Sequence, residues 1–257
     1  MDLGLRGKRA LVTASSGGMG ANISRTLAAE GANVVLFART ADKLEAIARE
    51  ISSRHGVEAH AVAGSMVAAA DVARLAAILR NLGGVDIVVL VTGRPPNPLR
   101  ATLDETDEAR WHEAYQSQLW GVVQVLGDVV PLMIDRGWGR IIAVTSASAK
   151  QPMAAHALST VFRAGVTAYM KGLANELGNR GITVNCVAPA LIETSHREGA
   201  SAYTEEQAQH RVRLTPLGRM GTQEELCGVV TFLASRQAGF VTGSTVAVEG
   251  GMVGSLF

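Results

Sequence analysis

Short apolar runs alternate with stretches of helical period along the chain of 257 residues, and this alternation limits the fold more than any other feature. The apolar residues in these runs are continuous, as in strands that are buried on both faces of a parallel sheet. Strands are predicted at residues 8–14, 33–38, 57–63, 85–91, 140–146, 182–188 and 244–250. Helices are expected to begin near Met19, Ala41, Ala69, Thr106, His156 and Thr222. The pattern predicts a single-domain, doubly wound α/β fold over residues 1–257, with a seven-stranded parallel sheet.

Composition excludes several classes of protein. Hydrophobic residues make up 47% of the chain and charged residues 18%, which excludes a disordered chain. The net charge is +1 with no basic block, so no nucleic-acid partner is expected. No apolar run reaches the about 18 residues of a membrane span, and the N-terminus lacks the core of a signal peptide. We therefore expect a cytoplasmic protein without a membrane partner.

The two cysteines, Cys186 and Cys227, lie far apart and form no CxxC pair. A disulfide framework and a thiolate metal site are therefore both unsupported. We expect each cysteine to be a small buried side chain, and we expect no metal site.

A glycine-rich turn follows the first predicted strand. The segment TASSGGMG at residues 13–20 places Gly18 and Gly20 where the strand gives way to a helix. Glycine lets the backbone approach a pyrophosphate, and the N–H groups at the helix start bind the anion. The second strand ends at Ala38 and Arg39, where an NAD-binding chain carries an acidic residue. Arginine accommodates a 2′-phosphate, so NADP(H) is the expected cofactor and NAD(H) the less favoured one.

Motifs over residues 5–251 resemble the short-chain dehydrogenase/reductase family, and most of all its group related to 3-oxoacyl-(acyl carrier protein) reductases. TASSGGMG matches TGxxxGxG with Ala14 for the first glycine, and NCVAPA from Asn185 matches NxVxPG with Ala190 for the last. The segments PLGRMGTQEE, FLAS, VTG and VEGG are also similar. The resemblance implies a Rossmann fold. It also implies cofactor contacts from residues at the strand ends: Thr13, Ser15, Ser16, Gly18, Met19, Gly20, Ser65, Gly93, Arg163, Pro189, Ile192 and Thr194.

The positions that carry catalysis in that family are altered in this chain. The resemblance implies an Asn–Ser–Tyr–Lys set in which the tyrosine is the general acid and base. The corresponding residues here are Gln118, Ser146, Ser159 and Arg163, so only the first serine is retained. A serine hydroxyl is far less acidic than a tyrosine of pKa about 10, and arginine does not release its proton. A reductase with this sequence therefore needs another proton donor.

Two residues near Ser159 are candidate donors. His156 lies three residues before it and is of the type that titrates near neutral pH, whereas Lys150 follows Ser146 in the segment SASAKQP. We predict an NADP(H)-dependent oxidoreductase that interconverts a carbonyl and a secondary alcohol through an unusual relay. Two alternatives stay open: a lyase, isomerase or cyclase on the same scaffold, and a non-catalytic cofactor-binding protein.

Two long segments without a clear pattern follow strand ends. GRPPNPLRATLDE follows the fourth strand, and residues 190–216, which include Tyr203, follow the sixth. Open α/β sheets bind ligands outside the carboxyl ends of their strands. We therefore expect both segments to be mobile lids over a small-molecule site.

Apolar residues in the long helical stretches exceed the number that one sheet face needs. An excess of this kind is typical of an interface, and the family resemblance implies a homotetramer. The candidate interface residues are Trp120, Val123, Leu126, Val130, Val166, Tyr169 and Leu173.

Overall fold

The computed structural model describes residues 1–193 and 205–255, which form one parallel sheet of seven strands. The strand order is β3-β2-β1-β4-β5-β6-β7. The chain therefore builds the sheet outward from β1 to β3, crosses back to place β4 on the other side of β1, and continues outward to β7. The predicted doubly wound fold and all seven predicted strands are confirmed. The strands are β1 (Arg9–Thr13), β2 (Asn33–Ala38), β3 (Ala59–Ala63), β4 (Ile87–Val91), β5 (Gly139–Val144), β6 (Ile182–Pro189) and β7 (Thr245–Val248).

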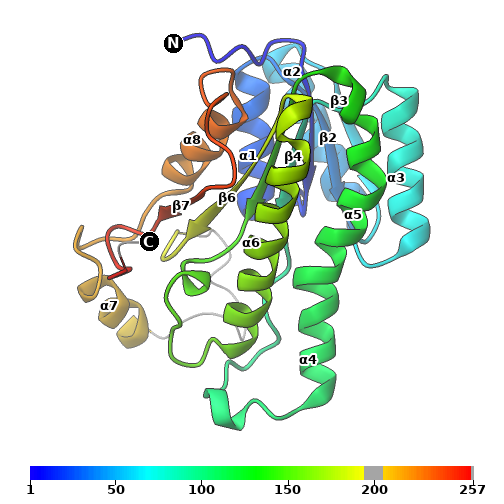
Figure 1. Cartoon of the computed structure of the whole chain (residues 1–257). Coiled ribbons are helices and arrows are strands. Elements are labelled where there is room, and N and C mark those ends of the chain that lie inside the picture. The colour runs from blue at the N-terminus through cyan, green and yellow to red at the C-terminus, as the bar shows by residue number, and fades with distance from the viewer. Residues whose placement is uncertain (194–204, 256–257) are drawn as a thin grey trace.

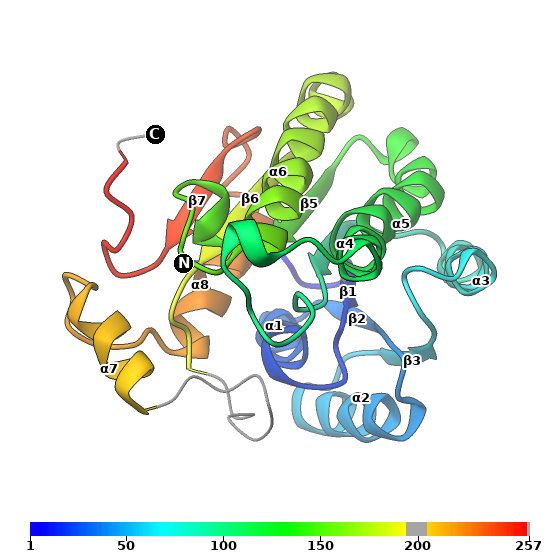
Figure 2. The same ribbon diagram turned by 90° about the horizontal axis from the view of Figure 1, so that it is seen from below.

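Helices cover both faces of the sheet (Figures 1 and 2). One face carries α1 (Gly18–Ala29), α2 (Ala41–His55) and α8 (Gln223–Ala234). The other face carries α3 (Ala69–Asn81), α5 (Gly121–Val129) and α6 (Ala157–Leu177), and α4 (Glu108–Ala114) continues α5 beyond the sheet. Each of the six expected helix starts lies within two residues of an observed one.

The sheet separates two apolar layers, and this explains the continuous apolar runs. Leu36 of β2 packs into the layer under α1, α2 and α8, whereas its neighbour Phe37 packs into the layer under α3, α5 and α6. Both side chains are fully buried. Because successive residues of a strand point to opposite faces, a strand with both faces covered needs apolar residues at every position.

The stretch Glu108–Arg136 is long and apolar enough to cross a membrane by length and composition alone, because an 18-residue window within it has a mean hydropathy of 1.3. In the fold it is a core element. Val122, Val125 and Val129 of α5 are fully buried against the sheet. The stretch is also not one α-helix, because a π-helical segment, η2 (Tyr115–Trp120), joins α4 to α5.

The segment after β4 is held in place by Arg110 of α4. The guanidinium donates to the Glu105 carboxylate at 2.6 and 2.9 Å. It also donates to the backbone carbonyl oxygens of Asn97 at 3.1 Å and Pro98 at 2.7 Å. The side chains of Glu105 and Arg110 are only 3% and 10% exposed. The buried ion pair and these backbone contacts tie the segment to α4, and its mobility stays a prediction.

The segment after β6 contains a helix that its polar composition did not reveal. α7 (Glu205–Arg213) is followed by the buried Thr215, and before it Ile192 pairs with Gly221 in an isolated bridge. Two residues singled out above, Thr194 and Tyr203, lie outside the described residues.

Some of the expected interface residues belong to the core of the single chain. Leu126, Val130 and Val166 are at most 8% exposed and pack under the sheet, so their apolar character needs no partner. Trp120 remains 39% exposed, and Val161 of α6, which the sequence analysis missed, is 49% exposed.

We predict that Arg110→Met costs about 3 kcal/mol of unfolding free energy, because it leaves the buried Glu105 carboxylate without its partner. Arg100→Met is the matched control, since Arg100 lies 3.9 Å from the same carboxylate but is 35% exposed, and it should cost less than about 1 kcal/mol. Denaturant unfolding of both variants measures the loss of unfolding free energy in each. Equal losses would contradict the stabilising role of the buried ion pair between Arg110 and Glu105.

The same pair predicts a pH dependence. The Arg110 guanidinium lowers the pKa of the Glu105 carboxyl below its usual value of 4.5. Because the folded-state pKa is the lower one, the stabilisation is fully present above pH 4.5 and is lost as the pH falls through the folded value. The stability gap between the wild type and Arg110→Met should therefore narrow below pH 4.5.

Candidate functional site

The glycine-rich turn joins β1 to α1 with almost no space between them. A Cβ atom on Gly20 would lie 2.5 Å from the carbonyl oxygen of Ala14, so no other residue fits there. Gly18 has φ +54°, which glycine adopts freely. Ala14 has φ +50° although it carries a Cβ, so this chain tolerates a strained residue where the family has glycine. No side chain caps the start of α1, where Gly17 is the N-cap residue.

Thr13 connects the ends of β1 and β4, where the strand order reverses. Its hydroxyl donates to the carbonyl oxygen of Val91 at 2.9 Å and accepts from the Val91 N–H at 2.8 Å. Ser15 follows in the turn and is fully buried, and its hydroxyl has no partner among the described residues. Ser16 and Met19 are half-buried beside it.

Arg39 and Ser65 lie at the ends of the two neighbouring strands. Arg39 follows β2 with its side chain exposed, and no hydrogen bond or ion pair ties it to another described residue. Ser65 follows β3, and its N–H donates to the Asp71 carboxylate at 2.9 Å. The sequence analysis did not single out Asp71. Arg74 and the Ser65 N–H together lower its pKa, the N–H having the larger effect.

Three serines meet at the place where the family's tyrosine is missing. The Ser148 hydroxyl donates to the Ser146 Oγ atom at 2.9 Å, and the Ser148 N–H donates to the same atom at 3.2 Å. The Oγ atoms of Ser148 and Ser159 lie 3.4 Å apart. Ser148 is fully buried and Ser159 is 6% exposed, whereas Ser146 is half-buried. The link through Ser148 was missed, because it depends on the turn η5 (Ala147–Ala149) folding back over Ser146.

Arg163 is buried and donates hydrogen bonds to three neutral oxygen atoms. Its guanidinium donates to Gln118 Oε1 at 3.1 Å, to the Val144 carbonyl at 2.8 Å and to the Gly93 carbonyl at 2.9 Å. Burial lowers the pKa of Arg163 to about 10, so it stays cationic at neutral pH. No carboxylate of the described residues pairs with it. The predicted residues Gln118, Gly93 and Arg163 are therefore in direct contact.

The two candidate proton donors lie at the start of α6 and in the turn before it. His156 precedes α6, and its Nδ1 atom lies 2.7 Å from the carbonyl oxygen of Ala154. Burial lowers the pKa of His156, so it is mainly neutral at pH 7. Lys150 is half-buried and forms no hydrogen bond or ion pair with the described residues. The contact that the described residues show for His156 is with the Ala154 carbonyl and not with a serine hydroxyl.

The remaining predicted cofactor residues lie at the end of β6. Pro189 ends the strand β6. Ile192, three residues after Pro189, pairs with Gly221 in an isolated bridge. Between them Leu191 has φ +50°, next to the position where the family has glycine. The described part of this segment therefore lies at the same edge of the sheet as Gly93 and Ser146.

Three buried polar atoms without a hydrogen-bond partner lie at this edge, and five others lie elsewhere among the described residues. Ser15 Oγ, Thr92 Oγ1 and Gln118 Nε2 are all buried without a hydrogen-bond partner among the described residues. A buried polar group without a partner is costly, so such groups indicate a ligand or an ordered water. Together with the closely packed Gly20 they fit a dinucleotide laid along the ends of β1 and β4. Among the described residues, no cluster of three metal-ligating side chains occurs.

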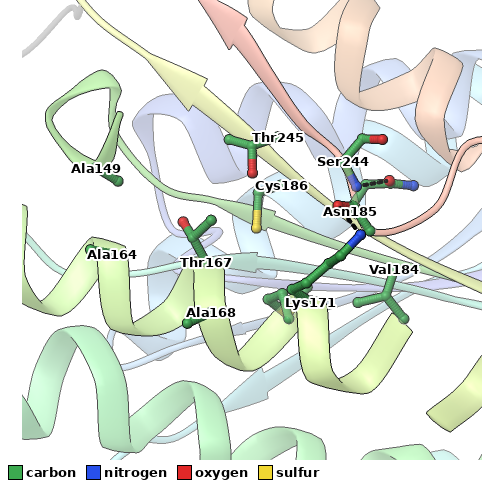
Figure 3. Close-up of a pocket in the computed structure, with 12 residues that line it drawn as sticks. Ala149, Ala164, Thr167, Ala168, Lys171, Val184, Asn185, Cys186, Ser244 and Thr245 are labelled. Atoms are coloured by element: carbon green, nitrogen blue, oxygen red, sulfur yellow. Dashed lines mark hydrogen bonds between the residues drawn. The ribbon is translucent and has the colours of Figure 1, made fainter. Parts of the chain in front are cut away.

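A separate cavity of about 340 Å³ lies behind the site, between α6 and strands β6 and β7 (Figure 3). Lys171 donates to the Gly243 carbonyl at 3.2 Å across it, and Thr167 faces Cys186. Burial raises the pKa of the Cys186 thiol to about 12 and that of Cys227 to about 11. Both cysteines are unpaired and buried, as expected, and remain protonated thiols at neutral pH.

Known proteins resemble the chain over almost its full length. Residues 13–253 match a family model described as enoyl-(acyl carrier protein) reductase. The 3-oxoacyl-(acyl-carrier-protein) reductase of Aquifex aeolicus is 33% identical over 253 residues, covering 98% of this chain and 100% of that protein. Dehydrogenase/reductase SDR family member 4 of Oryctolagus cuniculus is 34% identical over 250 residues, covering 96% of this chain and 94% of that protein.

A solved structure shows the same fold. L-sorbose reductase from Gluconobacter frateurii, complexed with NADPH and L-sorbose, superposes with a TM-score of 0.91 at 32% identity, and the match covers 100% of both chains. The sheet order, the glycine-rich turn and these matches agree with one another. The chain belongs to the short-chain dehydrogenase/reductase family of oxidoreductases.

Proposed function

We propose that the protein is an NADP(H)-dependent oxidoreductase that interconverts a small carbonyl compound and a secondary alcohol. The observation that carries this proposal is the uncapped, glycine-rich start of α1, with Arg39 exposed at the end of the neighbouring strand β2. The sorbose reductase with the same fold is complexed with NADPH, which supports the choice of cofactor.

Several side chains of the site have separate roles in such a reaction. The bound cofactor supplies or accepts a hydride. Ser146 is half-buried and offers its hydroxyl to a substrate oxygen, while Arg163, which donates to the Val144 carbonyl two residues earlier, stays cationic at neutral pH. Since Arg163 holds its proton at neutral pH, the proton for a reduced carbonyl comes from His156, from Lys150 or from solvent.

The cofactor preference is tested at Arg39. Two charge-assisted hydrogen bonds to a 2′-phosphate contribute about 2–3 kcal/mol. Arg39→Ala should therefore weaken NADPH binding about 30-fold and leave NADH binding unchanged. Nicotinamide fluorescence measures both affinities. Arg49→Ala is the control, since Arg49 is an exposed residue of α2 paired with Glu45, and an unchanged NADPH-to-NADH ratio in Arg39→Ala would contradict the assignment.

The role of the missing tyrosine is tested by restoring it. Ser159 and Arg163 lie four residues apart on α6 and face the same side. Ser159→Tyr with Arg163→Lys should raise the rate of ketone reduction about 100-fold, because a lysine lowers the pKa of the tyrosine that it adjoins. Each single variant should gain much less. The measurement is NADPH oxidation with a panel of ketones, and a double variant no faster than Ser159→Tyr alone would contradict it.

We also propose a homotetramer, supported by the exposed apolar side chains Trp120 and Val161 on the helices of one face. Light scattering should then give a mass of four chains of 26.9 kDa each. Val161→Lys should lower that mass, because it places a charge in the interface. A 26.9 kDa particle at micromolar concentration would refute the tetramer.

A further inference from the structure

The cavity between α6 and strands β6 and β7 has an apolar inner wall. The wall is formed by Met170, Val184 and Cys186, which are all at most 2% exposed. Burial raises the pKa of the Cys186 thiol to about 12, so the thiol stays neutral and acts as a small apolar group. With about 340 Å³ the cavity reaches the roughly 300–1,000 Å³ of small-molecule pockets. It is therefore large enough for an organic ligand, and its inner wall favours an apolar one.

The polar side chains of the cavity already form hydrogen bonds within the chain. The Asn185 amide group donates to the Val241 carbonyl at 2.7 Å, and its oxygen accepts from the Ser244 N–H at 3.1 Å. The Thr167 hydroxyl donates to the Arg163 carbonyl at 2.9 Å, one turn earlier in α6. Because these groups have partners, they contribute little to the recognition of a polar ligand inside the cavity.

One cationic side chain lies at the rim of the cavity. Lys171 is exposed, and its ammonium group donates to the Gly243 carbonyl at 3.2 Å (Figure 3). An ammonium group has three N–H donors. Within residues 1–193 and 205–255, no carboxylate forms an ion pair with Lys171. Its charge is therefore available to an anion that approaches the rim from outside.

An apolar interior with a cation at its rim suits a ligand that has an apolar body and an anionic end. A cavity of about 150 Å³ binds benzene, so a cavity of about twice that volume accommodates a straight chain of roughly eight to ten carbon atoms. A carboxylate is the anionic end that an exposed lysine can meet without burying either charge. The charge and the volume together favour an alkanoate.

We propose that this cavity is a second ligand site and that it binds a straight-chain carboxylate of about eight to ten carbon atoms. The alkyl chain packs against Met170, Val184 and Cys186, and the carboxylate pairs with Lys171. No step of the proposed oxidoreductase reaction takes place there, so the proposal does not depend on that reaction.

The second site adjoins the elements that carry the altered catalytic positions. α6 carries Lys171 at the cavity and Arg163 at the other site, two turns apart. Ala149 lines the cavity and follows Ser148 in the turn η5. The two sites are neighbours, so a test of the second site has to distinguish binding in the cavity from binding beside the serines.

Titration calorimetry with octanoate and octylammonium tests the charge preference. The two ligands have the same chain length and opposite charges. We expect octanoate to bind at least tenfold more tightly, because Lys171 attracts one head group and repels the other. Equal affinities would overturn the proposal.

The role of Lys171 is tested by Lys171→Met, which keeps the length of the side chain and removes its charge. Octanoate affinity should fall about fivefold, the effect of a partly exposed ion pair. Lys43→Met is the matched control, since Lys43 is an exposed lysine of α2 on the other face of the sheet, and it should bind octanoate as the wild type does. An unaltered affinity in Lys171→Met would overturn the proposal.

Methionine methyl groups locate the bound ligand. Met170 lines the cavity, whereas Met153 lies in the segment between Ser146 and α6, where its sulfur accepts from Arg211 at 3.8 Å. In NMR spectra of protein with ¹³C-labelled methionine methyl groups, octanoate should shift the Met170 resonance and leave that of Met153 in place. A shift of Met153 alone would place the ligand beside the serines and overturn the second site.

Ala168→Trp fills the cavity from its exposed rim. Octanoate binding should be lost, and the particle mass from light scattering should equal that of the wild type. Ala164→Leu is a second filling variant in case Ala168→Trp folds poorly. Unaltered binding in both variants would overturn the site. A lower particle mass in the filled protein would show that a second copy of the chain covers the cavity, and would overturn it too.

Discussion

The buried guanidinium of Arg163 is the contact on which the site depends. It joins the end of β5 at Val144, the segment after β4 at Gly93 and the π-helical segment at Gln118. These three elements come from distant parts of the chain, and each contributes only an oxygen atom. The family's lysine has one nitrogen, whereas arginine has a planar fork that reaches several acceptors at once. The substitution therefore exchanges a group that tunes a tyrosine for one that braces the edge of the sheet.

The loss of the tyrosine and the change to arginine are consistent with each other. A cationic lysine beside a tyrosine lowers the pKa of the phenol and so assists proton transfer. In a site without the phenol, the lysine has no pKa to lower. What remains around Ser146 is a set of hydrogen-bond donors and a fixed charge. The glycine-rich turn is retained, whereas Ser159 and Arg163 stand at the positions that the resemblance gives to the tyrosine and the lysine.

The sheet could be predicted almost completely, because strands buried on both faces must be apolar at every position, as Leu36 and Phe37 illustrate. The resemblance to the family also points to Gln118, Ser159 and Arg163 as the residues at its catalytic positions. Ser148 could not be predicted, since only the fold of a short turn brings its hydroxyl between two other serines. The contacts of Arg110 could not be predicted either. Glu105 and the carbonyl groups of Asn97 and Pro98 become its partners only when the segment after β4 folds back.

The π-helical segment η2 between α4 and α5 determines which side chains of the continuous stretch α4–η2–α5 point inward. The inward positions Arg110, Ala114, Gln118 and Val122 are four residues apart. In an ideal α-helix of 3.6 residues per turn, each such step drifts by about 40°, so three steps would carry the last position about 120° around the axis. The wider π turn absorbs this drift and keeps Gln118 on the side of Arg163. A deletion of one residue there would restore regular helix and turn the amide away, so the length of this segment is as constrained as its composition.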